Sequence, residues 1–457
     1  MNLNEIKKIY FIGIGGIGMS AVARYFSARG VEVHGYDKTE TSLTKTLVKE
    51  GMTIHYNEDL SKIPNGVDVV VYTPAVPELH AELVFFREQG YEVIKRAAAL
   101  GIISRGMKTI AIAGTHGKTT TTSLTTHLLR TGGVDCSAFL GGIAQNFGSN
   151  FVPGKSDWVV VEADEFDRSF LHLDPDIAVI TSLDADHLDI YGDHETMLET
   201  GFRAFAGKIK PGGELIVQHQ LTGFFDGFNG LQSYGVQGGD YRAENIRVEE
   251  GFFVFDYQSG QKVIRDIKVS LPGRHNIENA TAAITIALKL GVSPEDIKKA
   301  LASFNGIKRR FDFIYRDEQV VYIDDYAHHP SELKAAIGAA RELFPGRKLT
   351  GIFQPHLFSR THDFAEGFAV ALDGLDEVLL LDIYPARELP MEGVTSAIIF
   401  DKMELSNKVQ LPKAKLLETL AGREIEVLMT LGAGDIDTMI DPIADLLTIK
   451  NKALSRN

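Results

Sequence analysis

The stretch TIAIAGTHGKTTTT, residues 109–122, constrains the fold more than any other part of the sequence. An apolar, β-branched strand leads into Gly114 and Gly117, and a threonine-rich helix begins at Lys118. Such a loop points backbone N–H groups and the positive end of a helix at anionic oxygens. The usual pattern, G-x-x-x-x-G-K-[ST], starts with a glycine, where this chain has Ile112. Since the two glycines still permit the tight turn, we expect a nucleoside triphosphate site.

Within this loop, Lys118 supplies a positive charge for the β and γ phosphates, and the hydroxyl of Thr119 is the usual ligand of a magnesium ion. The alternative is a glycine turn before an ordinary helix. The predicted ATP-binding residues of the loop are Gly114, Thr115, His116, Gly117, Lys118, Thr119 and Thr120.

Two polar side chains follow neighbouring strands of the same predicted sheet. WVVVEAD carries Glu162, and IAVITSLDADHLD carries His187 shortly after its strand. In an open parallel sheet, ligands collect outside the carboxyl ends of the strands. We therefore expect magnesium, as two ions, bound by Thr119, Glu162 and His187, with Lys118, Glu162 and His187 as the catalytic residues. A lone histidine is usually structural, but aspartates flank this one: Asp184, Asp186 and Asp189.

A second glycine-rich loop lies near the N-terminus. Gly13, Gly15 and Gly18 form G-x-G-x-x-G between a strand and a helix, and Asp37 follows about twenty residues later. By itself the pattern suggests NAD. Its physical basis is that glycines let the backbone approach a diphosphate at a helix N-terminus, so it specifies a diphosphate better than it specifies nicotinamide.

Strand-like and helix-like patches alternate through most of the 457 residues. This alternation is typical of α/β folds with parallel sheets. We predict three consecutive α/β domains: a Rossmann-like domain at 1–107, a central P-loop domain at 108–308 and a Rossmann-like domain at 309–457. Residues 221–270 are richer in glycine and aromatic residues and suggest an antiparallel insertion or a small sheet.

The composition excludes several classes of protein. Acidic residues outnumber basic ones by 61 to 47, and no basic run offers a face for nucleic acid. No apolar segment reaches the roughly 18 residues of a membrane helix. IYFIGIGGIGM lacks a clear signal-peptide cleavage site, and the single cysteine, Cys136, suits a reducing compartment. We expect a cytoplasmic enzyme that acts as a monomer or a homodimer.

Eight motifs occur in order along nearly the whole chain: GTHGKTT, EADEFDRSFLHL, DADHLD, GRHNIENATAA, KRRFD, DDYAHHP, QPHLFSR and GAGDID. In these motifs the chain resembles the Mur ligase superfamily. The resemblance implies an ATP-dependent amide ligase that forms an acyl phosphate and releases ADP and phosphate. GIGGIGMS and SFLHLDP favour the members that join L-alanine to UDP-N-acetylmuramate. The recycling ligase that attaches a murein tripeptide to the same sugar nucleotide is the alternative.

The resemblance also implies roles for individual residues. Asn279 corresponds to the asparagine that reads adenine, with His275 and Asn276 as weaker candidates, and Arg310 and Asp325 correspond to residues that reach the ATP phosphates and ribose. His356 and Arg360 correspond to residues that receive the amino acid. The residues implied for the UDP-sugar are Gly13, Gly15, Gly16, Gly18 and Asp37.

Two positions depart from the pattern of related ligases. Leu357 stands where many alanine-adding relatives have a basic residue, and Phe202 stands near the position of a lysine that several sister ligases carbamylate. We therefore carry no carbamate over from the resemblance. His328 and His329 do not suggest zinc, because adjacent residues seldom bind one ion. An NAD-dependent oxidoreductase and an ATP-hydrolysing regulator remain as rival readings.

Overall fold

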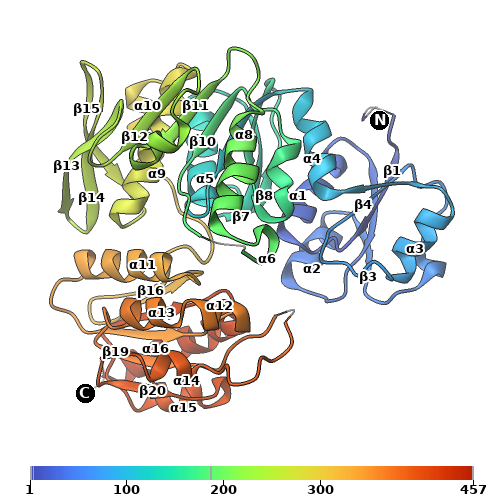
Figure 1. The fold of residues 1–457 in the computed structure, drawn as a ribbon. Helices are drawn as coiled ribbons and strands as arrows, with labels where there is room; N and C mark the ends of the chain where they lie inside the picture. The colour runs from blue at the N-terminus through green and yellow to red at the C-terminus, as the bar shows by residue number, and fades with distance from the viewer. Residues whose placement is uncertain (1–2, 4, 186–187, 387, 455–457) are drawn as a thin grey trace. The chain divides into compact units, whose positions relative to one another are not determined.

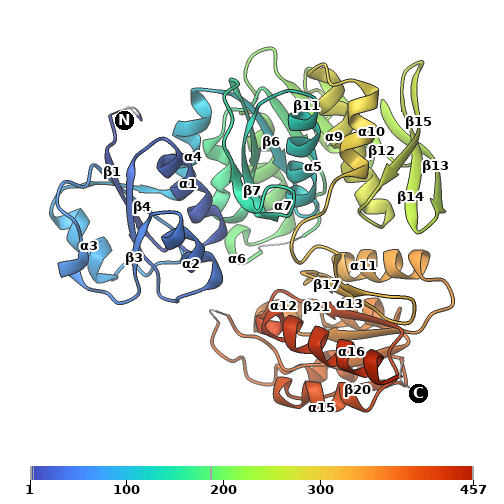
Figure 2. The ribbon, with the colours of Figure 1, turned by 180° about the vertical axis from the view of Figure 1, so that it is seen from behind.

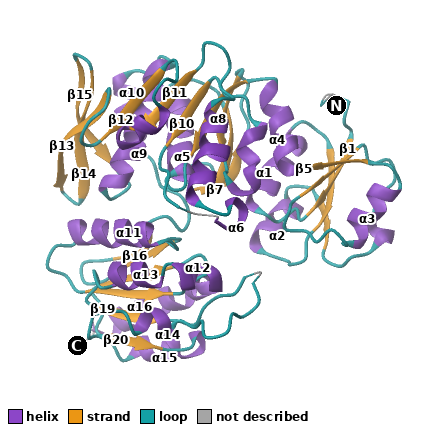
Figure 3. Ribbon diagram, in the orientation of Figure 1, coloured by secondary structure: helices purple, strands orange, loops and turns teal. Residues whose placement is uncertain are grey.

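The computed structural model describes residues 3, 5–185, 188–386 and 388–454. These residues form three sheets, one after another along the chain, with helices packed against them (Figures 1 and 3). The prediction of three consecutive α/β domains is confirmed. By compactness, the chain divides into two units: residues 1–244, 256–267 and 278–304 form the first, and 245–255, 268–277 and 305–457 form the second. The predicted domain boundaries near 107 and 308 remain predictions.

The first sheet is parallel and has the strand order β3-β2-β1-β4-β5. Since the order reverses beside β1, its carboxyl edge is the place where such sheets bind ligands. The strands are β1 (Lys8–Ile12), β2 (Glu32–Tyr36), β3 (Thr53–His55), β4 (Val69–Tyr72) and β5 (Glu92–Lys95). The helices are α1 (Ile17–Ala28), α2 (Ser42–Lys49), α3 (Ala81–Glu88) and α4 (Arg96–Arg105), with a short η1 (Leu60–Lys62).

The central sheet has ten strands in the order β15-β14-β13-β12-β11-β10-β6-β9-β7-β8. Its core strands are buried and β-branched, as expected for a sheet covered on both faces. The strands are β6 (Lys108–Ala113), β7 (Ser137–Ala144), β8 (Ser149–Val152), β9 (Trp158–Glu162), β10 (Ile177–Ile180), β11 (Glu214–Gln218), β12 (Leu231–Gly235), β13 (Tyr241–Glu249), β14 (Phe252–Ser259) and β15 (Lys262–Val269).

Of the two alternatives predicted for residues 221–270, an antiparallel insertion or a small sheet, the small sheet was wrong. β12 pairs in parallel with β11, so β12–β15 extend the central sheet. The physical reason is that the edge of β11 presents unpaired N–H and C=O groups, which the next strand satisfies.

The helices of the central domain surround this sheet. Between α7 and α8 the chain forms a π-helix, η3, which carries Phe202. Phe202 is fully buried, and its ring meets that of Phe170 edge-on at 5.4 Å. The helices are α5 (Lys118–Thr131), η2 (Phe166–His172), α6 (Leu188–Tyr191), α7 (His194–Met197), η3 (Leu198–Arg203), α8 (Ala204–Ala206), η4 (His219–Phe225), α9 (Arg274–Lys289) and α10 (Pro294–Ala302).

The third sheet has the order β16-β17-β21-β18-β19-β20 and is parallel except for β16. Apolar clusters lie on both faces, one with α11 and α13 and the other with α15 and α16 (Figure 2). The strands are β16 (Asp312–Arg316), β17 (Val321–Asp325), β18 (Leu349–Phe353), β19 (Glu377–Leu380), β20 (Lys408–Gln410) and β21 (Val427–Leu431). The helices are α11 (Pro330–Leu343), α12 (Phe358–Asp363), α13 (Ala365–Leu372), α14 (Ala397–Phe400), η5 (Lys413–Lys415), α15 (Leu416–Ala421), η6 (Asp435–Met439) and α16 (Ile440–Leu454).

Within the first unit, α1 of the first domain packs on β7 and β8 of the central domain. Arg24 is buried and donates to the side-chain oxygen of Asn150, which is fully buried on β8. Asn150 in turn donates to the hydroxyl of Ser20 at 2.8 Å. The ring of Tyr25 packs against Phe139 and Phe151. A polar contact inside an aromatic patch therefore joins the first two sheets.

No helix among the described residues has both the length and the apolar run that crossing a bilayer requires.

Candidate active site

The phosphate-type loop leaves the carboxyl end of β6 and enters α5. Gly114 has φ 133° and Gly117 has φ 80°, both in the region that favours glycine. A Cβ on Gly114 would lie 2.1 Å from the hydroxyl oxygen of Thr181, and one on Gly117 would lie 2.7 Å from Oδ1 of Asn279. A side chain at either position would strain the backbone and would collide with a neighbouring side chain, so both positions require glycine.

Lys118 begins α5, and its ammonium group lies within the loop. Nζ donates to the carbonyl of Gly114 at 2.6 Å and lies 2.7 Å from the carboxylate of Glu165, which is fully buried. Burial acts to lower the pKa of Lys118, but the charges of Glu165, Asp164 and Glu162 outweigh it and hold the pKa above its ordinary value. Lys118 is therefore a cation.

The Thr119 hydroxyl, also in the first turn of α5, donates to Glu162 at 3.2 Å. Glu162 ends β9, and its other carboxylate oxygen accepts from the backbone N–H of Gly141 at 2.9 Å. A Cβ on Gly141 would lie 2.1 Å from Glu162, so a glycine is needed there. A hydroxyl and a carboxylate side by side are hard oxygen ligands that suit magnesium. His187, the third predicted ligand, and Asp186 lie outside the described residues.

Polar residues that follow β10 form hydrogen bonds with the loop between β6 and α5. The hydroxyl of Ser182 accepts from the backbone N–H of His116 at 2.7 Å and lies 2.9 Å from the hydroxyl of Thr115. The Thr115 hydroxyl accepts from the N–H of Asp184 at 3.0 Å, and Nε2 of His116 lies 3.3 Å from the Asp184 carboxylate. These contacts give Thr115 and His116 a part in shaping the loop.

Further along, α5 and α9 meet behind the loop. Thr120 is buried in the first turn of α5. The hydroxyl of Thr121 donates to Oδ1 of Asn279 at 3.2 Å, and that oxygen faces Gly117. Asn279 thus stands directly behind the phosphate loop. Its contact with adenine remains a prediction.

The first glycine loop joins β1 to α1 at the reversal of strand order. Gly13 has φ 86°, and its N–H donates to the carbonyl of Tyr36 at 2.8 Å. Gly16 precedes the first residue of α1. The N–H of Gly15 donates to the carboxylate of Asp37 at 2.7 Å, and a Cβ on Gly15 would lie 2.8 Å from that carboxylate. Asp37 therefore holds the loop in shape, and its contact with uridine remains a prediction.

Arg96 was not identified from the sequence. It starts α4, and its Nη1 lies 2.8 Å from the place of a Cβ on Gly18. Its Nη2 donates to the Ser169 hydroxyl at 3.4 Å and lies 3.6 Å from Asp164. The motif EADEFDRSF supplies both partners, so Arg96 links the first glycine loop to the acidic segment beside Lys118. Its place in the sequence, directly after β5, does not by itself indicate this link.

In the second unit, Asp325 ends β17 and is buried. Its two oxygens accept from the N–H groups of Phe311 and Ala327, each at 2.7 Å. Burial raises the pKa of Asp325 to about 6, against the opposing charge of Arg310. The guanidinium of Arg310 lies over the ring of Tyr326 at 5.2 Å. Both predicted residues therefore lie where the chain passes from the KRRF motif to β17.

His356 and Arg360 follow β18. The His356 ring stacks on Tyr384 at 6.0 Å and meets the ring of His328 edge-on at 6.2 Å. The charge of Arg360 contributes to a lowered pKa of His328, after burial as the main cause. Leu357, between them, has φ 69°, a left-handed conformation that a leucine rarely adopts. Thus the two predicted amino-acid-binding residues gather around His328.

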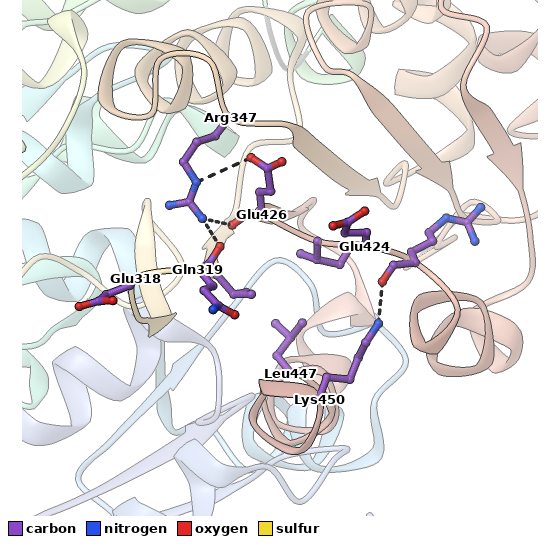
Figure 4. Close-up of a pocket in the computed structure, with 10 residues that line it drawn as sticks. Glu318, Gln319, Arg347, Glu424, Glu426, Leu447 and Lys450 are labelled. Carbon is purple, nitrogen blue, oxygen red and sulfur yellow. Dashed lines mark hydrogen bonds and ion pairs between the residues drawn. The ribbon is translucent and has the colours of Figure 1, made fainter. Parts of the chain in front are cut away.

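A pocket of about 420 Å³ in the same unit is lined by Arg347, Arg423, Lys450 and several glutamates (Figure 4). The charged groups of Arg423 and Lys450 already bind other groups of the protein. Arg423 donates to Glu377 at 2.7 Å, and Lys450 donates to the carbonyl of Ala421 at 2.9 Å. Since it lies away from every motif, we regard this pocket as structural. No cluster of three metal-binding side chains occurs among the described residues.

Family models match three consecutive parts of the chain: "Mur ligase family, catalytic domain" over residues 8–108, "Mur ligase middle domain" over 112–287 and "Mur ligase, glutamate ligase domain" over 309–436. The chain belongs to the Mur ligase family. Each glycine loop described above lies in a separate matched part.

Among curated relatives of this Mur ligase, a UDP-N-acetylmuramate–L-alanine ligase of Flavobacterium johnsoniae is 48% identical over 98% of this chain and 99% of its own length. The ligase of the same name from Parabacteroides distasonis is 49% identical over 98% of both chains. A solved structure, UDP-N-acetylmuramate-alanine ligase MurC of Thermotoga maritima, is 29% identical, with a TM-score of 0.84, over 97% of this chain and 99% of its own. A murein peptide ligase of Psychrobacter arcticus, at 22% identity and a TM-score of 0.70, shares the fold.

Proposed function

We propose that this Mur ligase joins L-alanine to the lactyl carboxylate of UDP-N-acetylmuramate and converts ATP to ADP and phosphate, as a step in peptidoglycan precursor synthesis. The observation that carries the proposal is the placement of Lys118, Thr119 and Glu162 around one phosphate loop. Relatives 48–49% identical over nearly the whole chain support the choice of substrates.

The reaction takes two steps. An oxygen of the lactyl carboxylate attacks the γ-phosphorus, the bond to the β,γ-bridging oxygen breaks, and ADP leaves. The amine of alanine then attacks the acyl carbon, and the tetrahedral intermediate expels phosphate and loses a proton from nitrogen. Because carboxylate and triphosphate repel each other, neutralising charge and aligning the attack are the main tasks.

The residues of the central domain divide these tasks. Lys118, kept as a cation, offsets negative charge on the transferred phosphoryl group. Thr119 and Glu162 would hold magnesium, which supplies further positive charge beside the phosphates. Two ions and a ligand role for His187 are part of the proposal. Phe202, buried among aromatic rings, leaves that position without a lysine to carbamylate.

The other substrates are assigned by position. The glycines at 13, 15, 16 and 18 bind the diphosphate of the UDP-sugar at the N-terminus of α1. Asn279 contacts adenine, and Arg310 and Asp325 reach the ATP phosphates and ribose. His356 and Arg360 receive alanine. We further propose domain boundaries near residues 107 and 308, a cytoplasmic location, and a monomer or homodimer.

A phosphate-release assay tests the function. Full-length protein is incubated with ATP, magnesium, UDP-N-acetylmuramate and one amino acid or peptide at a time. L-Alanine should give ADP and phosphate in equal amounts. AMP and pyrophosphate as products would contradict an acyl phosphate, and a preference for the murein tripeptide would favour the recycling ligase. Binding of NAD in place of the UDP-sugar would favour an oxidoreductase, and ATP turnover without the other substrates would favour a regulator.

A further inference from the structure

The motif EADEFDRSF contains a backbone turn that L-residues rarely adopt. Asp167 has φ 51° and ψ 24°, and Arg168 has φ 56° and ψ 27°, so two consecutive residues with side chains are left-handed. Aspartate tolerates this region better than other residues, but arginine gains nothing from it. Strained backbone of this kind persists where its surroundings fix it, and it is common at ligand sites.

The neighbours of Arg168 show what fixes the turn. The Asp167 carboxylate lies 3.0 Å from Nζ of Lys95, and the Ser169 hydroxyl accepts from Arg96 at 3.4 Å. Phe170, the next residue, is buried in the core. The residues on both sides of Arg168 are therefore anchored, and the turn between them presents its side chain.

Arg168 is exposed, and its guanidinium lies over the ring of Tyr191 at 5.2 Å. Among the described residues its guanidinium has no hydrogen-bond or ion-pair partner, although acidic residues exceed basic ones by 61 to 47 in the chain. Other arginines of the first unit do have acidic partners: Arg24 pairs with Glu50 at 2.8 Å and Arg203 with Glu199 at 3.0 Å. The donors of Arg168 are thus not used by the described part of the protein.

Contacts on either side place Arg168 between the two glycine loops. The Tyr191 hydroxyl donates to the carbonyl of Glu165 at 2.8 Å, and the Glu165 carboxylate pairs with Lys118 of the ATP loop. On the other side, Ser169 contacts Arg96, which lies against Gly18 of the first loop. The residues around Arg168 are therefore in contact with both loops.

We propose that Arg168 binds the lactyl carboxylate of UDP-N-acetylmuramate and directs it toward ATP. This inference rests on the proposed function. The planar guanidinium matches a carboxylate through two parallel N–H···O bonds, and the ring of Tyr191 supports its face. The same charge reduces the repulsion between the carboxylate and the triphosphate.

Calorimetry on the full-length protein tests the proposal with two ligands. UDP-N-acetylmuramate carries the lactyl group, and UDP-N-acetylglucosamine is the same nucleotide sugar without it. Arg168→Ala should weaken binding of the first about ten- to a hundredfold, the scale for a hydrogen bond to a charged group, and leave binding of the second unchanged. Arg168→Lys should recover little, because an ammonium lacks the fork.

Arg168→Gly separates the effect of losing the guanidinium group from the effect of the strained backbone. Glycine adopts the left-handed turn freely, so this variant should unfold at a higher temperature than Arg168→Ala but bind UDP-N-acetylmuramate equally weakly. Arg265→Ala, which removes an arginine 72% exposed on β15, should match the wild type in both assays.

Equal weakening of both ligands by Arg168→Ala would assign the residue to the diphosphate and overturn the proposal. Unchanged binding of both would overturn it as well. These outcomes differ from failure of the proposed function, in which the wild-type protein itself would not bind UDP-N-acetylmuramate.

Discussion

The ammonium group of Lys118 and the carboxylate of Glu165 form an ion pair at 2.7 Å, with 12% of the lysine side chain and none of the glutamate exposed. A lysine that neutralises a triphosphate must turn part of its contact from this carboxylate to phosphate oxygens. Glu165 therefore keeps Lys118 charged and in place, and it also competes with the nucleotide for it.

Glu165→Gln should lower the thermal midpoint of unfolding, because it removes the carboxylate that pairs directly with a buried cation. We expect a loss of about 2 kcal/mol, less than for complete removal of a partner since the amide oxygen still accepts. ATP should raise the midpoint of this variant more than that of the wild type. Glu199→Gln, which breaks an exposed pair with Arg203, should change the midpoint little. Equal midpoints in both variants would contradict this role of Glu165.

Lys118→Ala should reduce kcat by at least about a hundredfold, the scale for loss of one preorganised charge at a transition state. Binding of UDP-N-acetylmuramate should persist, because we assign it to the first glycine loop. Steady-state kinetics and calorimetry measure the two effects. Loss of sugar-nucleotide binding together with turnover would show that the two loops do not serve different ligands.

Arg360→Ala should raise the KM for alanine strongly and leave binding of ATP and the UDP-sugar nearly intact. Arg360 follows the carboxyl end of β18, where an α/β domain presents its ligands. Arg360→Lys should recover little, because an ammonium cannot form two parallel bonds to a carboxylate. Steady-state kinetics at varied alanine concentration measure this KM. An unchanged KM for alanine would mean that Arg360 is only a surface residue.

Glu82 should make the stability of the first domain depend on pH. It is fully buried, with the Tyr10 hydroxyl at 2.8 Å, and burial raises its pKa from 4.5 to about 7. The folded chain therefore holds this proton more tightly than the unfolded chain, so stability falls as pH rises from about 4.5 to 7. The full effect is about 3 kcal/mol.

Glu82→Gln removes this titration. The thermal midpoint of the variant should exceed that of the wild type at pH 8, and the difference should shrink toward pH 5. Glu88→Gln, at an exposed position of the same helix, should follow the wild type at every pH. Parallel curves for Glu82→Gln and the wild type would show that the carboxyl does not titrate in this range.

The sequence predicted the residues that its local pattern defines. Gly114 and Gly117 lie between β6 and α5, Lys118 and Thr119 begin α5, and Glu162 ends the neighbouring strand β9. The roles of Arg96 and Arg168 depend on partners distant in the chain: Arg96 and Ser169 are 73 positions apart. The pattern of apolar and polar residues along the sequence does not indicate such long-range contacts. The path of β12–β15 was missed for the same reason, since pairing with β11 is decided by an open sheet edge.

The buried contact between Arg24 and Asn150 has a consequence for rate as well as for stability. It joins α1, which begins at the first glycine loop, to the sheet that carries the ATP loop. The orientation of one phosphate-binding loop relative to the other is then fixed during folding. The binding of the substrates therefore costs little further orientational entropy. A change at Asn150, on β8 and outside both glycine loops, would lower the effective concentration of the carboxylate at ATP.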